Sequence, residues 1–471
     1  MTELMLCHGC IGDEILSAEV RASGTRSRCH HCERNRKGWS LRQLADRIHP
    51  VLQANYEPVY PGPYDRYTFE PSGDDPAFVI TEMAGLDDSR IGESIQTILS
   101  DRYGYNAQRD GGMDPYGDEV NYRFAEPDMG YLHLSWTSFR DLLLTRSRFF
   151  NSRARSMLDD IFADLEDLDA GKGCPVIRRF SATRPTLFYR GRVATDKPSL
   201  SAILADPVRQ LAAPPHALAR AGRMNARGIS LFYGALDPQT CLAELRPPVG
   251  SHVVVTAFQN VRPLRLLDLG RLRSISTGAS MFAPNFRERS ELAGFLGQLV
   301  EELSRPIMPG SEELDYLPTQ AVAEYLAGRE DLELDGMLFP SSQRIQGELN
   351  VVLFPDASHA TGRAMPTGSH VSMSGPDKDE NGDPEDVYVW ITPPPKKRDR
   401  QKARRDTSLD QLLGPIPAIR HRRSQAADGS VPTLKWVENS LEIFAIKEID
   451  YNRDRHLVRR CIEHRRKLPK F

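Results

Sequence analysis

Four polar residues between positions 190 and 341 stand where the local pattern predicts ordered structure and where they could act on a charged substrate. Arg190 ends an apolar, aromatic run at residues 188–190, and Tyr233 lies within a second run at 229–235. Both runs are typical of β-strands. Ser341 begins a loop after the strand-like residues 337–339, and Glu244 lies on a short helix. Together these four side chains form a candidate enzyme active site.

The helix that carries Glu244 is predicted from its start signals. Asp237 is a good N-cap residue, and Pro238 suits the first helical position. An apolar stripe follows at Cys241, Leu242 and Leu245. Glu244 lies beside this stripe and therefore at the margin of the core. A carboxylate in that position can stay ionised in a partly dry cleft when arginines from neighbouring segments face it.

Each of these residues also has an ordinary structural explanation. A single arginine at a strand end is more often a surface ion-pair partner than a ligand, and the same holds for Glu244 taken alone. Tyr233 fits a strand core, because a half-buried pleated surface favours aromatic side chains. The order in which the pieces recur along the chain, more than any single piece, favours an active site.

The motifs together resemble the RES domain family, which is named for its arginine, glutamate and serine. The resemblance covers roughly residues 180–356, and a last strand is expected near 440–450. The matching motifs are Tyr189-Arg190, Gly222-Arg223-Met224-Asn225 with Gly228, Tyr233, Leu242-Ala243-Glu244, Pro340-Ser341, and Asn350 with Phe354. Met224 departs from the family pattern, which usually has an aromatic residue there.

The resemblance implies an α+β fold with an ADP-ribosyltransferase-like mixed β-sheet core and flanking helices. It also implies an enzyme that uses NAD as its substrate and cleaves the bond between nicotinamide and ribose. Such domains usually act as toxins of toxin-antitoxin systems, so an antitoxin protein is an expected partner. The acceptor of ADP-ribose stays open. Water would make the protein an NAD glycohydrolase, phosphate an NAD phosphorylase, and a protein or nucleic-acid group an ADP-ribosyltransferase.

The resemblance also implies roles for individual residues. Glu244 would stabilise the positive charge that develops on the ribose. Arg190 and Arg223 would hold the pyrophosphate, because a planar guanidinium donates paired hydrogen bonds. Ser341 has no evident histidine partner, which favours binding over nucleophilic catalysis. The expected catalytic set is Arg190, Tyr233, Glu244 and Ser341. The expected NAD-binding set is Arg190, Arg223, Asn225, Tyr233 and Ser341.

Two cysteine pairs near the N-terminus, Cys7 with Cys10 and Cys29 with Cys32, have the spacing of zinc-ribbon knuckles. Four thiolates complete the tetrahedral shell that zinc prefers, and such a site needs no large core. A disulfide-bonded or unliganded segment is the alternative. No apolar region of a secretory signal precedes the cysteines, which favours reduced thiols. We therefore expect a structural zinc ion.

The length of 471 residues predicts more than one domain. The expected parts are a zinc ribbon at 1–39, a helical domain at 40–172, the RES catalytic domain at 173–356, a disordered basic insertion at 357–435, and the last RES strand with a basic segment at 436–471. The net charge of −3 argues against a whole-chain nucleic-acid binder. No apolar run is long enough to span a bilayer, and we expect a cytoplasmic protein. The sequence makes no prediction of the oligomeric state.

The helical domain is predicted from amphipathic patterns. Its apolar positions are Leu41, Leu44, Ile48 and Leu52; Ile91, Ile95, Ile98 and Leu99; and a longer series at Phe139, Leu142, Leu143, Phe149, Phe150, Leu158, Ile161, Phe162 and Leu165. The region resembles the HEPN-like segment attached to some RES proteins. It lacks a convincing form of the Arg-x(4–6)-His motif of the ribonuclease versions, so we expect support or partner binding there.

Basic runs at 396–405 and 453–467 are candidate contacts for nucleic acid. They contain almost no aromatic residues for base stacking, which favours solvated segments instead. A different class of function is a catalytically inactive RES fold that binds nucleic acid or protein through its zinc ribbon and basic tail. The intact set of Arg190, Tyr233, Glu244 and Ser341 favours the enzyme.

Overall fold

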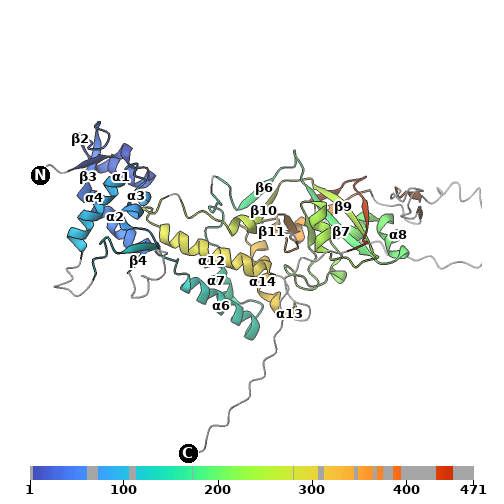
Figure 1. Ribbon diagram of the computed structural model, residues 1–471. Coiled ribbons are helices and arrows are strands. Elements are labelled where there is room, and N and C mark those ends of the chain that lie inside the picture. Colours follow the sequence, from blue (N-terminus) through green and yellow to red (C-terminus); the bar gives the residue numbers. More distant parts are fainter. Residues whose placement is uncertain are drawn as a thin grey trace, which may run out of the picture.

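The computed structural model describes residues 4–60, 73–104, 113–171, 173–278, 280–305, 312–343, 348–363, 369–374, 386–393 and 431–448. The N-terminal residues form a unit of short strands and helices, and a larger mixed sheet with flanking helices follows (Figure 1). The predicted basic runs at 396–405 and 453–467 lie outside these ranges. Within them, no helix is both long enough and apolar enough to cross a membrane.

The first strands carry the cysteine knuckles. Strand β1 (Met5–Cys7) pairs with β3 (Asn35–Ser40), which also pairs with β2 (Thr25–Arg28), and both pairings are antiparallel. The 3-10 turn η1 (His8–Cys10) and helix α1 (Glu14–Ser23) connect β1 to β2. Helix α1 begins at an N-cap aspartate, whose side chain accepts a hydrogen bond from the backbone of the first turn.

Three helices and a two-stranded antiparallel sheet complete the N-terminal unit. They are α2 (Leu41–Asn55), α3 (Pro76–Ala84), α4 (Ser89–Tyr103) and the pair of β4 (Tyr56–Val59) with β5 (Asn121–Phe124). Ser40 and Gln43 form a capping box at the start of α2. The stripe predicted along α2 is buried, as are Ile95 and Leu99 of α4. These two helix predictions are confirmed.

The cysteine strands and these helices share one hydrophobic core. Cys10 is buried in the same cluster as Leu44 and Ile95. Gly85 ends α3 with φ of 59°, and a Cβ at this position would collide with the backbone of Gly12. The Gly12 N–H donates to the Gly85 carbonyl at 2.9 Å. The predicted boundary at residue 39 therefore separates two sequence patterns that pack into a single core.

The helical pattern predicted after residue 139 forms two helices. Helix α6 (Gly130–Thr145) and helix α7 (Ser152–Ile161) are separated by a turn, and both contribute buried side chains to the core of the larger unit. The region predicted as one helical domain at 40–172 is thus divided between two cores.

The turn between α6 and α7 corrects one sequence expectation. Phe149 and Phe150 were expected on the buried stripe, but their side chains are 76% and 106% exposed. The helical period stops at Thr145, where α6 ends, and resumes after Asn151, which caps α7 by accepting from the Ala154 N–H at 3.0 Å. The two phenylalanines therefore lie outside any helix.

The larger unit is built on a mixed sheet, which confirms the predicted α+β class. The strand order is β13-β16-β9-β7-β8-β12-β11-β10-β6, with β17 also paired to β9. The strands are β6 (Ile177–Phe180), β7 (Leu187–Ala194), β8 (Phe232–Ala235), β9 (His252–Asn260), β10 (Leu264–Asp268), β11 (Gly336–Pro340), β12 (Leu349–Leu353), β13 (Ala360–Thr361), β16 (Leu434–Trp436) and β17 (Glu442–Ala445). The β10–β11 and β13–β16 pairs are parallel.

Helices cover both faces of the sheet. They are α8 (Lys197–Ala205), α9 (Pro207–Leu211), α10 (Pro238–Glu244), α11 (Leu269–Leu272), α12 (Phe286–Ser304), α13 (Glu312–Asp315) and α14 (Leu317–Ala327), with the 3-10 turns η2 (His216–Leu218) and η3 (Pro355–Ala357). Along β12, Val352 faces the cluster that includes α6, α7, α12 and α14. Its neighbours Val351 and Leu353 face the cluster that includes α8, because side chains alternate along a strand.

The segment 357–435, predicted as a disordered insertion, contains regular structure in several places. Strands β13 and β16 join the main sheet, and β14 (His370–Met373) pairs with β15 (Val389–Thr392). The high Gly, Pro and Ser content of the segment favours a prediction of disorder, because strands of only a few residues barely change its average composition. The strand predicted near 440–450 is confirmed as β17, which pairs with β9.

Candidate active site and candidate metal centre

Glu244 is the last residue of α10, a helix that starts as the sequence predicts. The side chain of Asp237 accepts from the Thr240 N–H at 2.8 Å, and Pro238 occupies the first turn. The helix packs beside β7 and β8, and Cys241 is buried against them. This short, well-capped helix fixes the position of the Glu244 carboxylate beside the central strands of the sheet.

Two side chains hold the Glu244 carboxylate. The Ser341 hydroxyl donates to Oε1 at 2.6 Å, and the Asn350 amide Nδ2 donates to the same oxygen at 2.8 Å. Ser341 and Asn350 are buried, and they come from the loop after β11 and from β12. In the described part of the chain no donor binds Oε2, so this oxygen can accept a bond from a ligand.

Arg190 faces the same space from the middle of β7. Its Nη1 donates to the Tyr233 carbonyl at 2.9 Å, and the guanidinium lies 5.2 Å from the centre of the Phe232 ring. Burial lowers the pKa of Arg190 to about 10, so the group stays protonated at neutral pH. Around it is a cavity of about 290 Å³, lined by Arg190, Gly191, Tyr233, Gly234, Cys241, Glu244, Leu245, Phe339 and Asn350. A cation and a carboxylate therefore share one small cavity.

Tyr233 and Asn225 bind each other. The Tyr233 hydroxyl donates to Asn225 Oδ1 at 2.7 Å and accepts from the Met224 N–H at 3.1 Å. The Asn225 amide donates to backbone carbonyls, including that of Ile229 at 2.8 Å. Burial raises the pKa of Tyr233 to about 12, so the phenol stays neutral. Asn225 thus holds the Gly222–Asn225 turn and the tyrosine in place, while the tyrosine ring lines the cavity.

Replacement of Tyr233 by phenylalanine tests this positioning role. The change leaves the buried Met224 N–H and Asn225 Oδ1 without a partner, which is expected to lower the free energy of unfolding by about 1–3 kcal/mol. Urea unfolding measures the loss, with Tyr131→Phe, at a residue that is 72% exposed, as the control. An unchanged unfolding free energy combined with weaker substrate binding would show that the hydroxyl acts on the ligand instead.

Arg223 turns its guanidinium toward the end of α12. Its Nη1 donates to the Leu303 carbonyl at 2.7 Å and its Nη2 to the Arg305 carbonyl at 2.9 Å. Burial lowers the pKa of Arg223, and the nearby Tyr316 and Glu244 act in the opposite direction. The side chain therefore lies within electrostatic reach of the carboxylate, with part of its donor capacity committed to the helix end.

Ser341, which binds Glu244 of the first cavity, lines a second cavity. It measures about 1370 Å³ and lies between α6, α12, α14 and the end of β11. Trp136 of α6 lines it, and its Nε1 donates to Glu302 at 2.8 Å. Arg273 and Arg305 also line it. The pair of Ser341 and Glu244 thus stands between a small cavity and a much larger one.

Asn350 belongs to the candidate site, although it was not among the predicted catalytic or NAD-binding residues. It belongs to the Asn-x-x-x-Phe motif, yet its contact with Glu244 joins residues 106 positions apart. The signal in the sequence was the buried, strand-like run around it, since an asparagine inside such a run needs a polar partner. Arg190, Tyr233, Glu244 and Ser341 gather around one cavity or its rim, whereas Arg223 and Asn225 lie beside it.

Removal of the Ser341 hydroxyl tests how the carboxylate is held. Ser341→Ala deletes one hydrogen bond to a charged group, which is worth roughly 1.5–3 kcal/mol. If the orientation of Glu244 limits turnover, activity should fall about 10- to 100-fold. Steady-state kinetics would measure this, with Ser181→Ala as a matched loss of a hydroxyl hydrogen bond elsewhere. If Ser341→Ala turns over as fast as the wild type, Ser341 is not needed to orient the Glu244 carboxylate.

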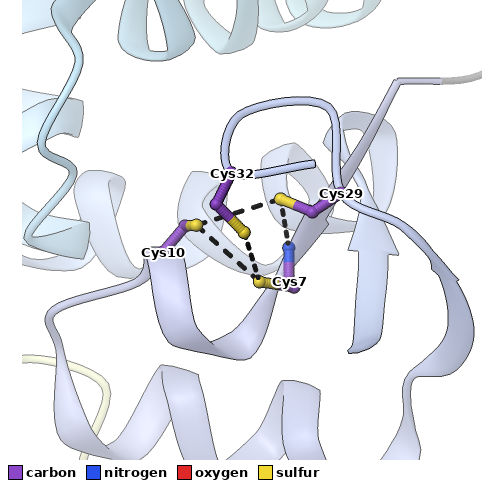
Figure 2. Close-up of side chains that lie close together, drawn as sticks. All are labelled: Cys7, Cys10, Cys29 and Cys32. Carbon is purple, nitrogen blue, oxygen red and sulfur yellow. Dashed lines mark hydrogen bonds between the residues drawn. The ribbon is translucent and has the colours of Figure 1, made fainter. Parts of the chain in front are cut away.

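The four predicted cysteines converge in the N-terminal unit, and Figure 2 shows their sulfur atoms gathered around one point. The sulfur of Cys7 lies 3.7 Å from that of Cys10 and 3.6 Å from that of Cys32, and Cys10 lies 3.8 Å from Cys29. Sulfurs bound to one tetrahedral ion at about 2.3 Å would be about 3.8 Å apart. A disulfide needs about 2.05 Å, so the disulfide alternative does not fit. The cluster has the geometry of a metal site.

The electrostatics of the cluster also fit a cation. Burial raises the pKa of the Cys7 and Cys10 thiols, whereas the backbone N–H of Arg34 lowers the pKa of Cys32 to about 6. Keeping all four sulfurs as thiolates in this space needs a positive ion. A Cys7 N–H to Cys29 sulfur contact at 3.4 Å helps to orient the ligands.

Comparison with known proteins finds a match over the segment that contains most of the candidate active site. A family model described as the RES domain matches residues 192–374. The matched segment contains Glu244, Ser341 and Asn350, and Arg190 lies just before its start. No curated protein was found to match the chain. The RES resemblance is thereby confirmed for this segment, while the HEPN-like and ADP-ribosyltransferase-like resemblances stay predictions.

Proposed function

We propose that this protein consumes NAD, cleaving the bond between nicotinamide and ribose and passing ADP-ribose to an acceptor. The observation that carries the proposal is the Glu244 carboxylate, held by Ser341 and Asn350 at a cavity that also contains Arg190. The RES match over 192–374 supports NAD as the ligand, since the family is known for NAD-related toxin function.

The chemistry suits a fixed carboxylate. As the bond from ribose C1′ to nicotinamide breaks, its electron pair leaves with the ring nitrogen, which becomes neutral. The ribose then carries positive charge shared between C1′ and the ring oxygen. Glu244 stabilises that charge, and its Oε2 is placed to accept a bond from a ribose hydroxyl. Because Ser341 and Asn350 hold Oε1 beforehand, the carboxylate needs little reorganisation during the reaction.

The cavity sizes suggest how the substrate lies. A space of about 290 Å³ is at the lower limit for a ligand pocket and suits the nicotinamide and ribose better than a whole dinucleotide. We place the adenylate half in the larger cavity beyond Ser341. Arg190 and Arg223 then serve the phosphates between the two halves, and Tyr233 packs against the nicotinamide ring.

The acceptor is open among water, phosphate and a macromolecular group, each of which offers an oxygen that can bond to C1′ and lose its proton. Reaction of the purified protein with NAD in phosphate buffer and in phosphate-free buffer separates these cases. Mass spectrometry would show free ADP-ribose for water and a phosphorylated ADP-ribose for phosphate. Covalent ADP-ribose on protein or nucleic acid would identify a transferase. NAD that stays intact in both buffers would overturn the proposed activity.

Three further roles belong to the same proposal. The metal is zinc with a structural role, since four thiolates leave no open coordination position for substrate. The protein acts as a toxin in the cytoplasm and is neutralised by an antitoxin. The predicted helical region supports the fold or binds a partner. Growth arrest on expression, relieved by loss of Glu244, would support the toxin role.

A further inference from the structure

The turn between α6 and α7 exposes aromatic side chains that the NAD site does not use. Phe149 and Phe150 are 76% and 106% exposed, so neither ring contributes to a core of this chain. Exposure of two adjacent phenylalanines leaves a large apolar area in water. Figure 1 shows α6 and α7 together at the lower edge of the folded part of the molecule.

Hydrogen bonds on both sides of the two rings hold the turn in an ordered conformation. The Ser147 hydroxyl donates to the Phe149 carbonyl at 2.7 Å, and the Asn151 amide donates to the Ser147 carbonyl at 2.9 Å. Phe150 has φ of 54°, a left-handed conformation that bulky residues rarely adopt. Backbone strain of this kind is more common where a side chain must be presented to a ligand.

Arginines flank the two rings on each side. Arg146 and Arg148 precede them, Arg153 and Arg155 follow, and all four are exposed. The sequence from 142 to 158 contains no Asp or Glu, although the whole chain is slightly acidic. Across the described ranges none of these four side chains makes an ion pair with another residue. The turn, defined here as residues 146–155, is therefore a concentrated positive surface around two open aromatic rings.

We propose that the turn 146–155 binds single-stranded nucleic acid. A single strand offers phosphates and bases close together along one chain, and the turn offers two adjacent rings between two pairs of guanidiniums. Arginine pairs with phosphate through two hydrogen bonds, and phenylalanine stacks on a base of any type. A helix that binds a lipid surface presents a long apolar face, and two rings in a turn between α6 and α7 do not supply one. The site lies apart from the residues assigned to NAD and goes beyond the proposed function.

Fluorescence anisotropy with a labelled single strand of about 15 nucleotides, as RNA and as DNA, tests the proposal on the full-length protein. The double variant Phe149→Ala, Phe150→Ala should bind at least about tenfold more weakly. The variant Arg146→Gln, Arg148→Gln should reduce the slope of log affinity against log salt by about 0.7 for each arginine removed. Circular dichroism and nicotinamide release would report whether these variants stay folded.

Matched controls use an exposed phenylalanine and an exposed arginine from other helices. Phe78→Ala in α3 and Arg209→Gln in α9 should leave nucleic-acid binding unchanged. The proposal is overturned by a wild type that binds neither strand, or by turn variants that bind as well as the controls. It is equally overturned if the protein binds vesicles containing anionic phospholipid through these residues and ignores the single strands.

Discussion

Replacement of Glu244 by glutamine is expected to lower the rate of NAD cleavage by at least about 10²- to 10³-fold. Glutamine keeps the shape of the side chain and an oxygen that can accept from Ser341 and Asn350, so the fold should be retained. What it loses is the negative charge that stabilises the developing positive ribose. Nicotinamide release under saturating NAD measures the effect on turnover.

Glu288→Gln is the matched control for this variant, because it removes the same charge from an exposed position on α12. It should match the wild type in rate, with a small loss of thermal stability, because Glu288 lies in the first turn of α12 and its charge favours the helix N-terminus. Turnover by Glu244→Gln within a few-fold of the wild type would mean that charge at this position is not needed. The site would then have to work through its arginines.

Removal of the metal is expected to unfold the N-terminal unit as a whole. Cys7 and Cys10 belong to the core that contains α2 and α4, and structural zinc sites contribute on the order of 10 kcal/mol to folding. Chelation, or a Cys10→Ser change, should therefore abolish amide-exchange protection in residues 41–55 and 89–103. Hydrogen-deuterium exchange measures this segment by segment, with Cys174→Ser at an exposed thiol as the control.

The same experiment separates a structural from a catalytic metal. Among the described residues, Phe282 of the larger unit is buried in the core of the N-terminal unit. Arg47 donates to the Phe282 carbonyl at 3.0 Å, and Ser280 donates to Asp13 at 3.0 Å. Protection in β7, β9 and β12 should survive metal loss, and NAD cleavage should continue. Loss of NAD cleavage while those strands stay protected would point to a metal-dependent reaction.

Local signals in the sequence were sufficient for several parts of the fold and site. Asp237 as N-cap and Pro238 in the first turn predict the start of α10, so Glu244 could be placed on this helix. The four cysteines could be predicted to lie together, because two Cys-x-x-Cys pairs are typical of structural zinc sites. The resemblance to the RES family predicted a last strand near 440–450, and β17 lies there, paired with β9.

Long-range contacts explain what the sequence did not provide. The bond from Asn350 to Glu244 depends on the sheet order that brings β12 beside β8 and α10, and no local pattern encodes that order. Arg223 stays a predicted pyrophosphate ligand, and the sequence did not show that two of its donors also reach the end of α12, some eighty residues away. Phe149 and Phe150 fit a helical stripe, but α6 ends at Thr145 and α7 starts only after its N-cap Asn151, so both rings lie in the turn between the helices.

The strands within 357–435 show a related limit. Their pairing with β9 and with each other supplies the stability that short strands lack alone, so composition over the whole segment could not reveal them. The same applies to domain boundaries, since α6 and α7 adjoin the N-terminal unit in sequence but pack against the larger one.

Proton NMR of the purified, metal-loaded protein with NAD would follow breakage of the nicotinamide–ribose bond directly. We expect nicotinamide to appear in equal amount to the NAD lost, and Glu244→Gln to suppress both changes. Intact NAD would contradict the proposed activity, as would cleavage at the pyrophosphate, which would yield nicotinamide mononucleotide in place of free nicotinamide.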